Sequence, residues 1–200
     1  MSILTAAPSG FAYVPELITA EEERTLLSWL AASHEWRDVV FRGQRALRRA
    51  LSFGARYLTQ GRSLSPAPPL PTELAGYRDR MVEAAVARLG PELALAGRTT
   101  ADFSLCTALQ YPQGAAIGWH ADNAKFGPTV LSLSMGASAR LQLSPASGEG
   151  LAAAPRFELE LAPRSLFVLA GEARAAWLHR LLPVRAPRHS FTVRASATVA

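Results

Sequence analysis

Two residues in the second half of the chain have a spacing that suits a metal site. His120 and Asp122 stand two apart in the stretch WHAD. In an extended chain, residues i and i+2 project from the same face, so this imidazole and carboxylate can share one metal ion. Taken alone, however, an H-x-D pair more often belongs to a polar loop, here the loop after the GAAIG turn.

A third ligand has few possible sources, because the chain has four histidines. His34 lies in the half that is predicted to be helical, whereas His179 follows a predicted strand. Two histidines and one carboxylate form the facial triad that holds non-haem Fe(II) and leaves three positions open for a co-substrate and oxygen. We therefore predict that His120, Asp122 and His179 bind one metal ion.

Two arginines near the end of the chain could bind the co-substrate. Arg188 and Arg194 stand six apart in RHSFTVR, an even separation that points both guanidinium groups to one face of a strand. A short dicarboxylic acid lying along that strand could be held by charge-assisted pairs with both groups. The alternative is two ordinary surface arginines in an arginine-rich chain.

Four segments, in order, resemble one known family. They are LQYPQGAAIGWHAD, the P-x-x-x-SLSMG run at 128–136, LAPRSLFVLAGEARAAWLH at 161–179 and RHSFTVR at 188–194. Together they resemble the catalytic core of the AlkB dioxygenases over about residues 100–194, and LSFGARY and PPLPTEL agree more loosely before it. Within the family, GEARAAWLH and the VLSLS run are most similar to the AlkB domain of the tRNA wobble-uridine hydroxylases.

This resemblance implies a fold, cofactors and roles for residues. The fold would be a double-stranded β-helix, or jelly roll, that binds Fe(II), 2-oxoglutarate and O2. The metal would lie on the three ligands named above. Arg188 and Tyr111 would hold the distal carboxylate of 2-oxoglutarate, and Arg194 the carboxylate beside the keto group, with Ser190 and Thr192 as lesser contacts.

The sequence departs from the family pattern at two places. Leu109 stands two residues before the tyrosine, where the family commonly has asparagine, so one amide contact to 2-oxoglutarate is missing. This should weaken co-substrate binding unless another residue compensates. In addition, Asn123, Ala124 and Lys125 follow the aspartate where repair enzymes often have acids, which puts the repair-type base pocket in doubt.

The rest of the chain predicts an α+β fold within one domain, residues 1–200. Residues 1–99 are expected to form a helical, nucleotide-recognition-like part, with a helix over about 20–32 behind a Thr19/Glu22 capping box and another from Thr72 to about Leu89. Residues 100–200 would form the catalytic jelly-roll core. Its expected strands lie at 102–109, 129–135, 139–143, 156–161, 165–170 and 189–194, and 146–155 is expected to be a loop.

Arginine dominates the charge of the protein, which is +5 with Lys125 as its only lysine. Residues 37–62 hold seven arginines and one acid, with aromatic residues between them. Such a segment suits a lid that pairs with phosphates and stacks on bases, and its alternative is a solvated face whose aromatics turn inward. The candidate substrate contacts are Arg45, Arg48, Arg49, Tyr57 and Trp119, although aromatics in a jelly roll more often belong to the core.

The composition of the chain bears on its possible disulfides, membrane segments and cellular location. Cys106 is the only cysteine, so no intramolecular disulfide can form, and a small buried thiol is expected there. The sequence has neither a signal-peptide pattern nor a run of about 20 apolar residues, so we expect no membrane partner and a cytoplasmic protein.

These observations favour an enzyme that oxidatively demethylates or hydroxylates alkylated nucleic acid, in DNA or RNA repair or in tRNA modification. One alternative is a hydroxylase or demethylase of protein side chains. Another is a non-catalytic nucleic-acid-binding module that keeps the fold, which Leu109 alone supports.

Overall fold

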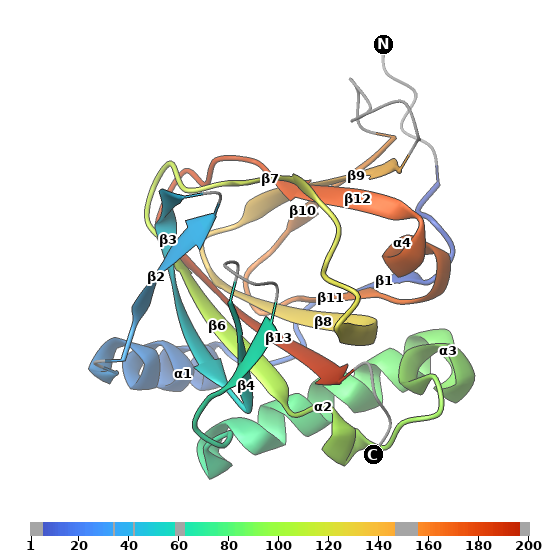
Figure 1. The fold of residues 1–200 in the computed structure, drawn as a ribbon, viewed down its shortest axis with the longest axis horizontal. Coiled ribbons are helices and arrows are strands. Elements are labelled where there is room, and N and C mark those ends of the chain that lie inside the picture. Colours follow the sequence, from blue (N-terminus) through green and yellow to red (C-terminus); the bar gives the residue numbers. More distant parts are fainter. Residues whose placement is uncertain (1–5, 34, 42, 59–62, 147–155, 197–200) are drawn as a thin grey trace.

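Two antiparallel sheets face each other in this computed structural model, which describes residues 6–33, 35–41, 43–58, 63–146 and 156–196 (Figure 1). Among these residues the larger sheet has seven strands, in the order β1 (Phe11–Val14), β11 (Leu166–Leu169), β8 (Phe126–Gly136), β13 (Arg188–Ser196), β6 (Leu105–Tyr111), β3 (Gln44–Phe53) and β2 (Arg37–Phe41). The smaller sheet has the order β10 (Phe157–Leu161), β9 (Ala139–Pro145), β12 (Trp177–Leu181) and β7 (Ile117–His120). A separate hairpin pairs β4 (Ala55–Leu58) with β5 (Ser63–Pro66).

Two long helices cover the larger sheet on the side away from the smaller one (Figure 1). Helix α1 (Ala20–Ala32) begins at the predicted capping box, in which Thr19 and Glu22 exchange hydrogen bonds. Helix α2 (Thr72–Leu89) has Pro71 rather than Thr72 at its N-cap, one residue from the prediction. Short helices α3 (Pro91–Leu95) and α4 (Gly171–Ala175) and the 3-10 turn η1 (Thr100–Asp102) complete the chain. No helix among the described residues is long and apolar enough to span a membrane.

Alternation along the central strands gives the larger sheet an apolar face towards the helices and a partly polar face towards the smaller sheet. On β13, Phe191 and Val193 pack against the helices, in a cluster that also contains Leu30 and Met81. The residues between them face the smaller sheet. This inward set is polar on β13 and β8: Arg188, Ser190, Thr192, Arg194, Ser132 and Ser134. The face of the larger sheet that looks towards the smaller sheet thus contains buried polar groups.

The six predicted C-terminal strands are present, whereas the N-terminal half is less helical than expected. We expected residues 1–99 to be a helical part beside the β core. Instead β1, β2 and β3 join the larger sheet, and β3 pairs with β6 from Arg49 to Phe53. Arginines at both faces of β3 hide the alternation by which a strand is recognised in sequence. The expected loop at 146–155 falls almost entirely outside the described residues.

Gly54 turns the chain from β3 into the β4–β5 hairpin. Its φ is +75°, and a Cβ atom there would lie 2.2 Å from the carbonyl oxygen of Ser104. Only glycine satisfies both the left-handed backbone and this close approach. The turn matters for the site because the hairpin carries Tyr57.

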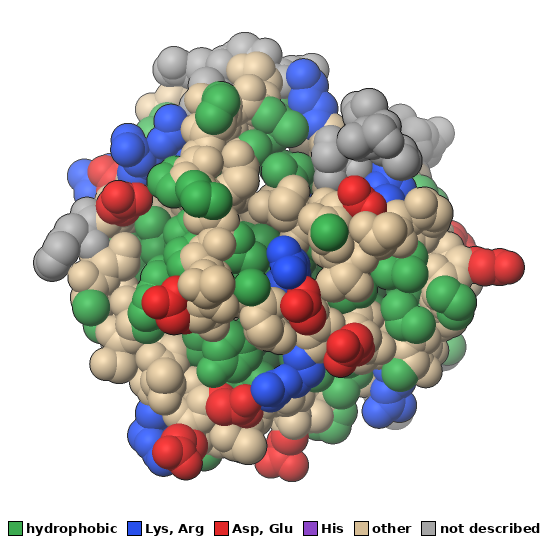
Figure 2. Space-filling view, turned by 90° about the horizontal axis from the view of Figure 1, so that it is seen from below, with side chains coloured by type: hydrophobic (Ala, Val, Ile, Leu, Met, Phe, Trp, Pro, Cys, Tyr) green, Lys and Arg blue, Asp and Glu red, His purple; other side chains and the backbone are tan. Residues whose placement is uncertain are grey.

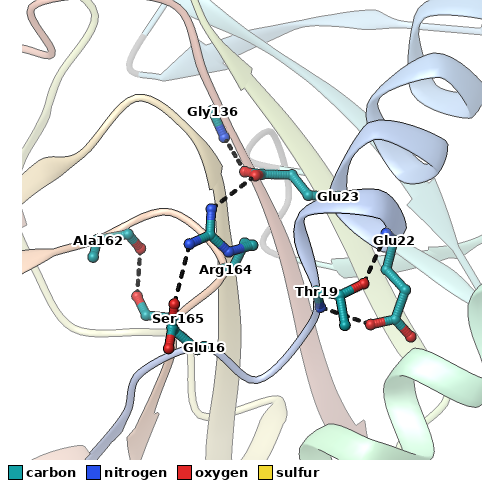
Figure 3. Close-up of polar contacts among 8 residues, drawn as sticks. All are labelled: Glu16, Thr19, Glu22, Glu23, Gly136, Ala162, Arg164 and Ser165. Carbon is teal, nitrogen blue, oxygen red and sulfur yellow. Dashed lines mark hydrogen bonds and ion pairs between the residues drawn. The ribbon is translucent and has the colours of Figure 1, made fainter.

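Glu23 joins helix α1 to the turn between β8 and β9 (Figure 3). Its Oε1 accepts a hydrogen bond of 2.8 Å from the backbone N–H of Gly136, and its Oε2 lies 3.5 Å from Nη1 of Arg164. Arg164 also contacts Glu16 at 3.3 Å and has a left-handed φ of +62°. One side chain therefore fixes a helix against two turns of the β core.

Replacing Glu23 by alanine should lower the free energy of unfolding by about 1–2 kcal/mol, because the Gly136 N–H loses its acceptor in a part-buried setting. Urea denaturation measures the loss. Glu21→Ala is the control, since Glu21 is an exposed acid in the same first turn. Equal losses in both variants would mean that only the charge at the helix N-terminus matters.

Candidate active site

The two candidate histidine ligands lie side by side on adjacent strands. His120 ends β7, His179 lies in β12, and the antiparallel register pairs them directly. Their ring centroids are 4.1 Å apart. The Nδ1–H of His120 donates to the Gly118 carbonyl at 2.9 Å, which leaves the Nε2 lone pair free to bind a metal.

Asp122 lies between the histidines and an arginine. Its Oδ2 is 3.7 Å from Nε2 of His179, and its Oδ1 accepts a hydrogen bond of 2.8 Å from Nη2 of Arg194. Burial acts to raise the pKa of Asp122, but the charge of Arg194, with a smaller contribution from Arg174, outweighs it and holds that pKa well below its usual range. The carboxylate is therefore ionised.

Both imidazoles are neutral, as metal ligands must be. Burial, followed by the neighbouring His120, lowers the pKa of His179 to about 3. Burial also lowers the pKa of His120, against the opposing effect of Asp122. Two neutral imidazoles and one carboxylate are the donors that non-haem Fe(II) takes.

Two of these donor atoms, on His179 and Asp122, lie farther apart than two ligands of one metal ion would. Two ligands at right angles, each about 2.1 Å from a first-row metal, lie about 3 Å apart, less than the 3.7 Å between His179 and Asp122. In the described part of the chain, no three His, Cys, Asp or Glu side chains are arranged to hold a metal as they stand. The salt bridge to Arg194 engages Oδ1 of Asp122, so Oδ2 is the oxygen that faces His179 and would have to move closer to it to share a metal.

The loop that carries Asp122 is fastened by three side chains. Arg174, on α4, donates from Nη2 to the carbonyls of Asn123 at 3.0 Å and Phe126 at 3.2 Å. Asn123 donates from Nδ2 to the hydroxyl of Tyr57 at 2.8 Å. The rings of Tyr57 and Phe126 pack with centroids 5.8 Å apart, which ties the β4–β5 hairpin to this loop.

Arg188 is a buried cation that forms no ion pair with any acid the structure describes. It is 1% exposed, and its Nη2 donates to the hydroxyl of Ser134 at 2.9 Å. Its Cζ lies 5.0 Å from the ring centroid of Tyr111, and burial lowers the pKa of its guanidinium. Its Nε is buried and has no hydrogen-bond partner within the described part of the chain, and the same holds for the Nε atoms of Arg174 and Arg194.

A buried guanidinium without a counterion is costly, so this geometry favours an anionic ligand. Arg188 and Arg194 both lie on the inward face of β13, and no described acid forms an ion pair with Arg188. A dicarboxylate such as 2-oxoglutarate would supply the missing acceptor oxygens. Beside them Leu109 pairs with Ser190 and contributes an apolar side chain to this wall.

The proposed substrate contacts do not all reach this site. Arg45 and Arg49 are exposed and lie near Asp38, at 2.9 and 3.9 Å. Trp119 projects from the face of β7 opposite to His120 and lies under Arg180, whose Cζ is 4.6 Å from its ring centroid. Only Arg48 and Tyr57 approach the site.

Sequence reasoning missed Arg174 as a functional residue and gave no role to Asn123. Arg174 lies on the one-turn helix α4, which is too short for a periodic pattern to indicate what its side chain contacts. Cavity shape would not have identified the site either. Two surface hollows, one lined by Arg24, Ser28 and Trp29 and the other around Ile18, include none of the site residues.

Comparison with known proteins identifies the family. A family model described as the 2OG-Fe(II) oxygenase superfamily matches residues 10–197. The tRNA (carboxymethyluridine(34)-5-O)-methyltransferase ALKBH8 of Mus musculus is 27% identical over 194 residues, which is 96% of this chain and 26% of that protein. The protein of the same name from Xenopus tropicalis is 27% identical over 88% of this chain and 26% of its own length. The chain thus spans about a quarter of these relatives.

Solved structures share the fold. The structure of OsALKBH1 has a TM-score of 0.71 at 14% identity, covering 96% of this chain and 99% of that one. A Pseudomonas putida prolyl-4-hydroxylase has a TM-score of 0.64 at 15% identity, covering 94% and 93%. These neighbours confirm the jelly roll that was expected from the sequence. The chain belongs to the 2OG-Fe(II) oxygenase superfamily as an enzyme of the AlkB type, a dioxygenase whose family implies Fe(II), 2-oxoglutarate and O2 as its cofactors.

Proposed function

We propose that His120, Asp122 and His179 hold the iron and that the enzyme demethylates or hydroxylates alkylated nucleic acid. One observation carries the proposal. A carboxylate and two neutral imidazoles lie close together, and the inward face of β13 holds a buried arginine that forms no ion pair with a described acid. A metal site next to a dicarboxylate site is what this chemistry needs.

Different side chains would bind the two carboxylates of 2-oxoglutarate. When bound, iron, 2-oxoglutarate and O2 supply an oxidant that removes hydrogen from a substrate C–H. Arg188 and Tyr111 would fix the distal carboxylate of 2-oxoglutarate, with Ser190 beside them, while Arg194 would hold the carboxylate next to the keto group. Because the wall is buried, it keeps water from the charged co-substrate and strengthens these contacts.

Charge distribution supports a polyanionic substrate. On the helix-covered face, acidic and basic side chains are interspersed with hydrophobic ones, and no continuous basic area covers it (Figure 2). Exposed arginines lie instead on the last two strands at one end of the larger sheet, Arg37 on the edge strand β2 and Arg45 and Arg49 on the adjoining β3. The β4–β5 hairpin follows β3 in the chain and contacts the loop of Asp122, because the hydroxyl of Tyr57 accepts a hydrogen bond from Asn123. The tRNA enzymes among the relatives agree with this choice.

Removing a ligand should abolish turnover. His120→Ala and Asp122→Ala should each lower succinate release by more than about 100-fold, because even loss of an outer partner of a metal ligand costs 10–100-fold. His189→Gln is the matched control, since His189 lies beside Arg188 but packs against Trp36, 6.1 Å between ring centroids. Succinate release that survives in the two ligand variants would refute the assignment.

A panel of methylated nucleosides, oligonucleotides and peptides should identify the substrate class. We expect succinate release to rise with a methylated oligonucleotide, and formaldehyde to appear in equal amount if an N-methyl group is the target. Stimulation by a methylated peptide alone would indicate that the enzyme acts on protein side chains and not on nucleic acid. Succinate without formaldehyde would indicate a stable hydroxylated product.

Nucleic-acid binding should depend steeply on salt. The double variant Arg45→Gln/Arg49→Gln should reduce the slope of log affinity against log salt by about 1.5 units, as expected for two lost phosphate contacts. The control Arg24→Gln/Arg88→Gln removes equal charge from helices α1 and α2. A slope that changes equally in both double variants would show that only net charge acts.

A further inference from the structure

Strand β3 sends its arginines to opposite faces. Arg49 pairs with Gln110, so the preceding Arg48 lies next to Tyr111 on the inward face of the larger sheet. Tyr111 in turn pairs with Arg188 on its other side. Residues that lie opposite one another on neighbouring strands form a row across the sheet. In the row that crosses β3, β6 and β13 here, Tyr111 lies between Arg48 and Arg188.

Arg48 differs from its two neighbouring arginines in what it contacts. It is half-buried, and its Nη1 donates to the Ala116 carbonyl at 3.1 Å, across to the chain that leads into β7. No described acid forms an ion pair with Arg48, whereas Arg45 and Arg49 share Asp38. Burial lowers the pKa of Arg48, against the opposing effect of Tyr111. Its other guanidinium nitrogens make no hydrogen bond to a described residue.

The adjacent row lacks a donor. There Ala50, Leu109 and Ser190 lie side by side, and Leu109 stands where the AlkB pattern has an asparagine amide. The wall that would hold 2-oxoglutarate therefore has one hydrogen-bond donor fewer in this row. In the next row it has one additional cation, Arg48, beside the tyrosine that would hold the distal carboxylate.

We propose that Arg48 is a binding residue for 2-oxoglutarate that compensates for Leu109, by contacting the distal carboxylate from the side of Tyr111 opposite to Arg188. This inference rests on the proposed 2-oxoglutarate site. A carboxylate held between two guanidinium groups gains charge-assisted hydrogen bonds that an amide would otherwise supply. Because Arg48 also bonds to the Ala116 carbonyl, it closes this edge of the co-substrate site.

Affinity for 2-oxoglutarate tests the proposal directly. It is measured by calorimetry without oxygen, on the full chain loaded with Mn(II) in place of Fe(II). Arg48→Gln should weaken 2-oxoglutarate binding by about tenfold or more, as expected for a lost hydrogen bond to a charged group. Arg49→Gln is the matched control, one residue away on the outward face, and should change this affinity by less than about twofold.

A second substitution separates compensation from a general loss of charge. Adding Leu109→Asn to Arg48→Gln should recover at least part of the lost affinity, because the amide restores a donor in the adjacent row. Mn(II) affinity without 2-oxoglutarate should be the same in all variants, and circular dichroism should show an unchanged fold. These two readouts exclude damage to the metal site or to β3.

Each contrary result has a distinct meaning. If Arg48→Gln binds 2-oxoglutarate as tightly as the wild type, the proposal is wrong, and a rise confined to the KM for a methylated oligonucleotide would assign Arg48 to the substrate instead. If Leu109→Asn fails to restore affinity in the Arg48→Gln background, compensation is wrong. If the Mn(II)-loaded wild type does not bind 2-oxoglutarate, the proposed site itself fails.

Discussion

The buried carboxylate of Asp122 is the constraint on which the site depends. Its burial disfavours charge, and the neighbouring cation Arg194, with a smaller contribution from Arg174, keeps it ionised. That arrangement requires the end of β7, the strand β12 and the strand β13 to meet, which the two facing sheets bring about. Arg174, Asn123 and Tyr57 then fix the loop between β7 and β8. Distant segments are therefore arranged around one ionised group.

The larger sheet also carries two cations whose charge no described acid balances. Arg188 is almost fully buried without a described carboxylate partner, and Arg48 is half-buried in the same condition. Such cations destabilise an isolated protein unless a ligand supplies the opposite charge. The two arginines are therefore the feature of the larger sheet on which the proposed dicarboxylate site rests.

Much of the site could be predicted because its parts follow local rules. The even spacing of Arg188 and Arg194 places both side chains on one face of β13, whereas Asp122 lies in the loop just after β7, beyond the strand that ends at His120. The Thr19 capping box likewise predicts helix α1 to the residue. What failed depends on contacts between distant strands. The register that sets Arg48 beside Tyr111, the entry of β2 and β3 into the sheet and the reach of Arg174 to the Asp122 loop have no local signal.

Anomalous diffraction from crystals soaked with Mn(II) tests the central claim most directly. The account predicts one strong peak about 2.1 Å from Nε2 of His120, Nε2 of His179 and a carboxylate oxygen of Asp122. A peak bound elsewhere, or coordinated by only one of the three side chains, would contradict the account.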